Sequence, residues 1–87
     1  MHHQARIQFS AHALERMAER GATREEVEHT ILNGEVSPAR QGRTRFQRTL
    51  PFNAEWNGRH YVHKQLAVFA VEEEGDWIVI TLICRYF

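Results

Sequence analysis

The hydrophobic pattern of this chain changes from a helical to a strand period at Gly34. From Ser10 to this glycine, apolar residues recur three or four positions apart, which is typical of amphipathic helices. Before Ser10, the segment "ARIQF" alternates, with Ile7 and Phe9 on one side, and is expected to form a short strand or an extended lead-in. After Gly34, apolar and polar residues alternate, as they do in half-buried strands. Because the helical and strand segments are segregated rather than interleaved, the pattern predicts an α+β fold. In that fold two N-terminal helices pack on one face of a small, curled antiparallel sheet of three to four strands.

The chain length limits the number of such units. With 87 residues, the chain is long enough for one hydrophobic core and too short for two. We therefore expect a single domain over residues 1–87. The helix pair is expected at about residues 11–33 and the antiparallel sheet at about residues 43–87.

Capping residues delimit the two predicted helices. Ser10 is a good N-cap for the first helix, and Gly21 can end it in a left-handed conformation. The "TREE" segment that begins at Thr23 is a capping box, and Asn33 and Gly34 end the second helix. The spacing predicts that the two helices bury Leu14, Met17, Ala18, Val27, Ile31 and Leu32.

Turn residues divide the second part of the chain into strands. The segment "RTRFQRTLPF" reads as a strand that Pro51 terminates, and Asn57 with Gly58 has the chemistry of a tight hairpin turn. "RHYVHKQLAVFAV" is expected to return as one long strand or as two strands broken by a bulge, and "EEEGD" to form a second hairpin turn. "WIVITLICRYF" is apolar on both faces, as a central strand is.

Composition and the N-terminal sequence indicate the cellular compartment and the kinds of ligand site that we expect. Eleven basic and eleven acidic residues give a formal net charge of zero, so any anion site must be local. The longest apolar run, from Trp77 to Cys84, is far shorter than the roughly 20 residues that span a bilayer. The N-terminus lacks the features of a secretory signal, and Cys84 is the only cysteine. We expect a cytoplasmic protein without a membrane partner.

Basic residues gather in the middle of the chain. No acidic residue occurs between Glu35 and Glu55, and this segment contains Arg40, Arg43, Arg45 and Arg48. These arginines can follow the phosphates of a nucleic-acid backbone. They can equally be the charges that protect an edge strand from aggregation. The sequence leaves both interpretations open.

Three polar residues follow one face of the first predicted helix at intervals of four, namely His12, Arg16 and Arg20. An imidazole that exchanges a proton near neutral pH and two guanidiniums that grip phosphate oxygens suit phosphate chemistry. The alternative is an ordinary solvated face with helix ion pairs of about 0.3–0.5 kcal/mol each. Spacing alone favours the solvated face.

Two further residues stand out in the strands. Thr81 interrupts an apolar run and shares its predicted face with Arg85, which suggests a polar patch on the sheet, although threonine is also a common strand residue. Lys64 is the only lysine beside ten arginines. His60 and His63 would face opposite sides of a strand, so we expect no metal site and no cofactor.

The stretch "SAHALERMAERGATREEVEHTILNGE" has the pattern S-x-H-A-x-x-R-M-x-E-R-G followed by a capped helix, and it resembles the bacterial domain of unknown function 4258 family. The later stretch "KQLAVFAVEEEGDWIVITLI" is similar to the closing hairpin of that family, which usually ends in V-V-T-V. Together the stretches cover most of the chain from Ser10 to Ile83. The segment from Arg40 to Arg59 matches no motif of the family.

The resemblance implies a fold like that of the barnase, colicin and RelE-type ribonucleases, and a toxin-like nuclease role. The polar residues that match the family pattern are His12, Arg16, Arg20, Lys64 and Thr81. The resemblance also implies a small antitoxin protein as a partner.

The hypothesis that follows is metal-independent cleavage of RNA by attack of the ribose 2′-hydroxyl on the phosphate. His12 would remove the hydroxyl proton or protonate the leaving oxygen, and Thr81 would bond a phosphate oxygen. The three matching cations would stabilise charge on the transition state. The predicted substrate-binding residues are Arg43, Arg45, Arg48 and Arg85. The alternative is a non-catalytic module that binds an anion, a nucleic acid or an acidic protein segment through the same residues.

Overall fold

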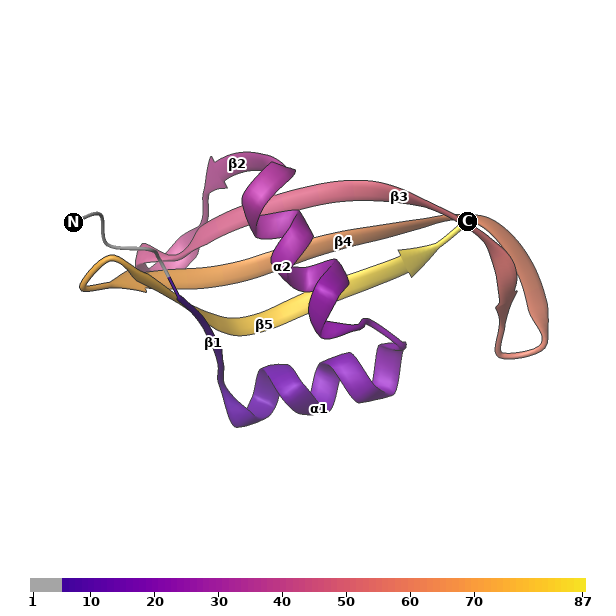
Figure 1. The fold of residues 1–87 in the computed structure, drawn as a ribbon, viewed down its shortest axis with the longest axis horizontal. Helices are drawn as coiled ribbons and strands as arrows, with labels where there is room; N and C mark the ends of the chain where they lie inside the picture. Colours follow the sequence, from indigo (N-terminus) through magenta and orange to yellow (C-terminus); the bar gives the residue numbers. More distant parts are fainter. Residues whose placement is uncertain (1–5) are drawn as a thin grey trace.

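The computed structural model describes residues 6–87 as a sheet with two α-helices and one short 3-10 helix. None of the described helices is long and apolar enough to cross a bilayer. Along the chain (Figure 1), the elements are β1 (Ile7–Phe9), α1 (Ala11–Arg20), α2 (Arg24–Asn33), β2 (Glu35–Pro38), η1 (Arg40–Gly42), β3 (Thr44–Trp56), β4 (Arg59–Glu73) and β5 (Asp76–Tyr86).

The sheet has five strands in the order β1-β5-β4-β3-β2. β1 pairs with β5 in parallel, and the other three pairs are antiparallel. The predicted α+β class is therefore confirmed, whereas the prediction of three to four strands in a purely antiparallel sheet is wrong. β1 lies in the alternating segment "ARIQF", for which a short strand is one of the two expectations. β2 has only four residues, too few alternations to be recognised by period.

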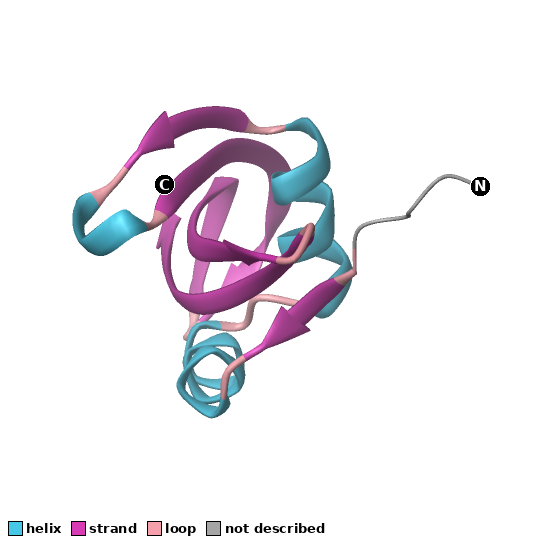
Figure 2. Ribbon diagram, turned by 90° about the vertical axis from the view of Figure 1, so that its left-hand side faces the viewer, coloured by secondary structure: helices cyan, strands magenta, loops and turns pink. Residues whose placement is uncertain are grey.

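The sheet is strongly coiled, and both α-helices pack on the same side of it (Figure 2). α2 packs against β3 and β4, while α1 runs alongside β5 in the same direction (Figure 1). The other side of the three long strands is called the open face below. The strand register assigns to it Arg45, Gln47 and Thr49 of β3, Gln65, Ala67 and Phe69 of β4, and Thr81, Ile83 and Arg85 of β5.

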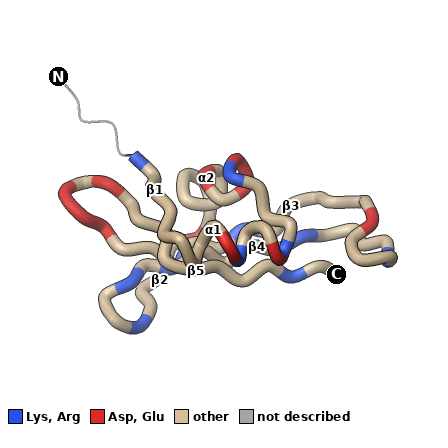
Figure 3. Tube along the Cα trace, turned by 90° about the horizontal axis from the view of Figure 1, so that it is seen from below, with Lys and Arg blue, Asp and Glu red and all other residues tan. Residues whose placement is uncertain are grey.

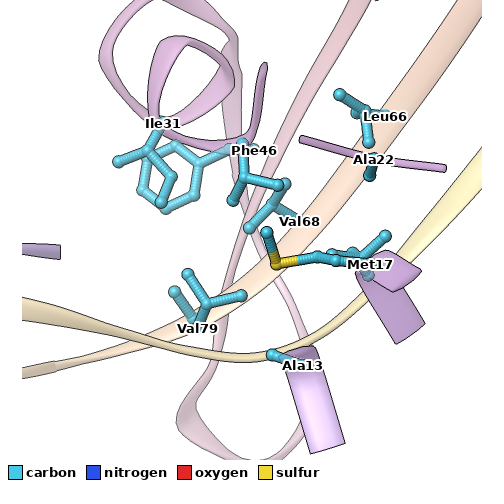
Figure 4. Packing of buried hydrophobic residues seen from close by; sticks show 11 residues of the cluster. Ala13, Met17, Ala22, Ile31, Phe46, Leu66, Val68 and Val79 are labelled. Atoms are coloured by element: carbon cyan, nitrogen blue, oxygen red, sulfur yellow. The ribbon is translucent and has the colours of Figure 1, made fainter. Parts of the chain in front are cut away.

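The hydrophobic core lies between the helices and the sheet (Figure 4). Its buried residues are Ala13, Met17, Ala22, Val27, Ile31, Phe46, Leu66, Val68, Ala70, Val79 and Leu82. Phe46 also packs edge-on against Trp77, with 5.0 Å between the ring centroids. The core thus ties both helices to β3, β4 and β5.

The buried stripe of each helix differs from the predicted one. In α1, Ala13 is buried together with Met17, whereas Leu14 is 45% exposed. In α2, Thr30 is fully buried and Leu32 is 74% exposed. The Thr30 hydroxyl donates to the Glu26 carbonyl at 2.8 Å, so this buried polar group is satisfied within its own helix. Small and self-satisfied side chains allow the helices to approach the sheet closely, which a period-based prediction does not detect.

The predicted caps are confirmed. Ser10 Oγ accepts a hydrogen bond from the Ala13 amide at 3.0 Å, and Gly21 ends α1 in the left-handed region with φ 74°. Thr23 and Glu26 form both bonds of the capping box, at 3.1 and 2.9 Å. These caps fix the first residue of each helix, and with it the side-chain positions of the first turn.

β3 continues beyond Pro51 to Trp56, so the prediction that the proline ends the strand is wrong. β2 pairs with β3 only as far as Gln47, and Pro51 therefore lies on a free edge, where its missing amide costs no ladder bond. A bulge follows between Pro51 and Ala54. Asn57 and Gly58 both have positive φ, 51° and 81°, and form the predicted turn to β4.

Candidate functional site on the open face

A bulge in β5 determines where Thr81 points. Phe69 of β4 pairs with Thr81, but the next residue, Ala70, pairs with Val79, so Ile80 is an extra residue. Two residues that are two apart in a strand normally share a face. Because of the bulge, Val79 is buried in the core while Thr81 faces the open side.

The same bulge anchors the start of α1. The Ser10 amide donates to the Val79 carbonyl at 3.0 Å, and the Ser10 hydroxyl donates to the Ile80 carbonyl at 3.0 Å. His12 follows in the first turn of α1, and its Nε2 lies 3.2 Å from Thr81 Oγ1. The His12 side chain is exposed, so the rest of its ring is accessible to a ligand.

Thr81 belongs to a row of side chains that crosses the open face. In the strand register, Thr81 pairs with Phe69 and Phe69 pairs with Arg45. Cross-strand neighbours of this kind have Cβ atoms about 5 Å apart. With His12 beyond Thr81, the row joins an imidazole, a hydroxyl, an aromatic ring and a guanidinium.

A hollow of about 570 Å³ lies over this row. Arg45, Phe69 and Thr81 line it from the sheet, and Arg40 and Arg43 line it from the loop that follows β2. Its lining contains no acidic residue. Arg43 directly precedes β3, so the two arginines do not share a strand as predicted, but both line the hollow. The hollow is a local basic site in a chain of zero net charge.

The other predicted residues of α1 and β5 lie farther along the same edge. Arg16 is half-buried, its Nε has no hydrogen-bond partner, and its guanidinium lies 3.6 Å from Glu19. Arg20 is eight residues from His12, which corresponds to about 12 Å along a helix. Arg85 shares the open face with Thr81, as predicted, but lies four residues farther along β5, about 13 Å away. Arg20 and Arg85 are therefore both distant from the His12–Thr81 contact.

Lys64 is on the opposite side of the sheet, and the structure does not bring it together with His12. Its side chain is 3% exposed, and its Nζ donates to the Gly21 carbonyl at 2.6 Å and to Glu26 Oε1 at 2.8 Å. It also lies 5.4 Å from the ring centroids of Phe52 and Tyr86. These contacts fasten the α1–α2 turn to β4, so the geometry gives Lys64 a structural role.

Arg48 also lies away from the predicted substrate surface. It pairs in register with Leu66 and therefore faces the helix side of the sheet. Its Nε is buried without a hydrogen-bond partner, and the residue lines a separate hollow of about 380 Å³ near the end of α2. Among the predicted substrate-binding arginines, the structure brings Arg43 and Arg45 together in the hollow, whereas Arg85 lies farther along the open face and Arg48 faces the helix side.

Known proteins can be compared with this chain in three features: the motif on α1, its contact with β5 at Thr81, and the closing hairpin. The family model described as "Domain of unknown function (DUF4258)" matches residues 9–83. The chain belongs to the DUF4258 family. Searches of the curated proteins and of the solved structures found no significant match. Membership confirms the resemblance read from the sequence and, by the family's own description, assigns no activity.

The charges of this DUF4258 member are distributed unevenly around the hollow. Figure 3 shows the basic loop after β2 and the acidic hairpin between β4 and β5 at the same end of the molecule, projecting to different sides. Among residues 6–87, no group of three or more His, Cys, Asp or Glu side chains is arranged to hold a metal ion. Burial raises the pKa of the Cys84 thiol and of the Tyr86 phenol, but both lie on the helix side.

Sequence reasoning missed Phe69, and it named Arg40 among the basic residues of the middle segment without including it in the substrate-binding set. Phe69 lies in "QLAVFAV", which is apolar on both faces, so the sequence gives no sign that this ring lines a polar hollow. Arg40 belongs to a loop in which Gln41 has φ 61°, and the direction of such a loop is set by its backbone geometry. Phe69 could have been identified from the strand register, which pairs it with Arg45 on one side and with Thr81 on the other.

Proposed function

We propose that the open face binds RNA and that His12 promotes metal-independent cleavage of a phosphodiester bond by attack of the adjacent ribose 2′-hydroxyl. We propose with it a relationship to the barnase, colicin and RelE-type ribonucleases, a cytoplasmic location and a small antitoxin partner.

The observation that supports the proposal is the contact of His12 with Thr81 at one end of the basic hollow. The distance from His12 Nε2 to Thr81 Oγ1 is 3.2 Å, and three arginines line the hollow. A group that exchanges protons near neutral pH therefore lies beside guanidiniums that suit phosphate oxygens. This combination is what general acid–base catalysis on a phosphate ester requires.

In the proposed reaction, His12 takes the proton from the 2′-hydroxyl while the 2′-oxygen forms a bond to phosphorus. The bond from phosphorus to the 5′-oxygen breaks, and this oxygen takes a proton from water, to which the face is open. The products are a 2′,3′-cyclic phosphate and a 5′-hydroxyl. The Thr81 hydroxyl orients the imidazole, and Arg45 and Arg43 stabilise the negative charge that develops on the phosphate.

The experiment that tests this function uses a fluorescent single-stranded RNA in EDTA. The wild-type protein should produce cyclic phosphate ends, and His12→Ala should reduce the rate by about 100-fold or more, since a general base contributes about 10²–10⁴-fold. His29→Ala is the matched control, because His29 is also an exposed helical histidine but lies on α2. Equal cleavage by the wild type and His12→Ala would show that the mechanism is wrong.

A non-catalytic binding module is the second candidate. One feature of the hollow favours this candidate. The hollow is lined by arginines, one aromatic residue and small or uncharged residues, and His12 is the single imidazole at its end. Such a surface can bind a polyanion without chemistry. In that case the RNA should remain intact and show a mobility shift that weakens steeply as salt is added.

A further inference from the structure

Phe69 is an aromatic side chain in the middle of a polar row. Arg45 lies beside it on β3 and Thr81 beside it on β5, and all three line the hollow. The hydrophobic core is on the other side of the sheet, so core packing does not account for the direction of this ring. A half-buried ring that lines a hollow is partly accessible to a ligand.

The surroundings of the ring indicate the chemistry of that ligand. Guanidiniums of Arg40, Arg43 and Arg45 line the hollow without an acidic residue, so an anionic ligand is favoured. A ligand that is both anionic and aromatic satisfies the arginines and Phe69 together. Nucleotides combine a phosphate with a planar base, and bases stack readily on aromatic side chains.

The distances along the row fit one nucleotide. Thr81 is the strand neighbour of Phe69, with about 5 Å between Cβ atoms of such neighbours, and His12 is in contact with Thr81. A base on Phe69 therefore places its own ribose and phosphate next to the His12–Thr81 contact. In a duplex the bases are stacked on each other and are not available to a side chain, whereas an unpaired base can be splayed out.

We propose that Phe69 is a stacking platform for one unpaired base and that the open face therefore selects single-stranded over double-stranded RNA. This inference rests on the proposed function, because it names the substrate class of the same surface. The face of Phe69 offers no hydrogen-bonding group, so the platform accepts any of the bases and contributes affinity rather than sequence choice.

The test measures the binding of 2′-O-methyl RNA, which lacks the attacking hydroxyl and cannot be cleaved, by fluorescence anisotropy. The probes are a single strand, the same strand in a duplex, and an abasic strand of equal length. Phe69→Leu removes the ring but keeps an apolar side chain, and Phe69→Tyr is the matched control that keeps the ring. Circular dichroism of each variant establishes that it is folded.

We expect the wild type and Phe69→Tyr to bind the single strand at least about ten-fold more tightly than the duplex. Phe69→Leu should lose about ten-fold in affinity for the single strand, equivalent to about 1.4 kcal/mol, and nothing for the abasic strand. A loss of affinity that is equal for the single strand and the abasic strand, or no loss, overturns the stacking platform.

If Phe69→Leu binds normally while the wild type cleaves RNA, only this inference fails and the proposed function stands. If the single strand is bound through Phe69 but never cleaved, the platform stands and the catalytic proposal fails.

Discussion

The Lys64 ammonium is the most completely enclosed charge among the described residues. It is 3% exposed, and its partners are the Gly21 carbonyl and the Glu26 carboxylate, which is 25% exposed. A buried amine with two hydrogen-bonded acceptors is satisfied, but removing it leaves a carboxylate without its counter-charge. The pair therefore makes the α1–α2 turn depend on β4.

Lys64→Ala should lower the free energy of unfolding by about 3 kcal/mol, the cost of breaking a buried ion pair by removing one partner. Urea denaturation measures this value. The double variant Lys64→Met, Glu26→Gln removes both charges and should recover part of the loss. In the proposed reaction, the folded double variant should cleave RNA at the wild-type rate, because the Lys64 side chain points to the helix side, away from the His12–Thr81 contact. Loss of cleavage in a folded double variant would contradict this structural role.

The junction of α1 with α2 packs against the far end of the β3–β4 hairpin. Trp56 stacks on Tyr86 with 5.1 Å between ring centroids and an interplanar angle of 12°, and the Tyr86 hydroxyl donates to the Arg20 carbonyl. A Cβ atom at Gly21 would come within 2.4 Å of the Trp56 ring. Two features therefore require a glycine at position 21, namely its φ of 74° and the closeness of the Trp56 ring.

Gly21→Ala should destabilise the protein more than Gly58→Ala does. Both glycines have positive φ, 74° and 81°, so each alanine costs about 1–2 kcal/mol for the left-handed conformation. A Cβ at Gly58 meets nothing within 4 Å, whereas the one at Gly21 must displace Trp56, which adds about 1–3 kcal/mol. Thermal unfolding followed by circular dichroism compares the two variants. Equal losses would show that the hairpin does not pack on this turn.

The stability of the whole molecule should fall at alkaline pH. Burial raises the pKa of Tyr86 above its usual value of 10.0, and burial likewise raises the pKa of Cys84 above 9.0. Above these usual values the unfolded chain releases protons that the folded chain still holds. Because the unfolded state then binds fewer protons, the free energy of unfolding decreases as pH rises through 9 to 10 and beyond.

Urea denaturation between about pH 8 and pH 11 measures this decrease. Tyr86→Phe should be less stable than the wild type at pH 8, because it lacks the bond to the Arg20 carbonyl, but its stability should fall less steeply above pH 10. Cys84→Ser provides the same comparison for the thiol. Parallel profiles for the wild type and Tyr86→Phe would contradict a raised pKa for this phenol.

Much of the fold follows from local sequence because its determinants act over a few residues. Ser10, Gly21 and the Thr23 capping box set the helix boundaries, and Asn57 with Gly58 sets a hairpin. The alternation of apolar and polar residues predicted the three long strands. Alternation left β1 open between a short strand and an extended lead-in, and β2 was missed, because such short strands are defined mainly by their partners in the sheet.

By itself the sequence determined the helix pair, the long strands, the family and the polar residues that suggest phosphate chemistry. Only the tertiary structure decided which of those residues share a face. One extra residue, Ile80, directs Thr81 to the open face beside His12, while register directs Lys64 and Arg48 to the helix side. Hydrogen bonds within a helix or turn are local, whereas bulges and strand register are fixed by partners tens of residues away. Composition and period therefore reveal the kinds of side chain that form the site, and packing assembles them.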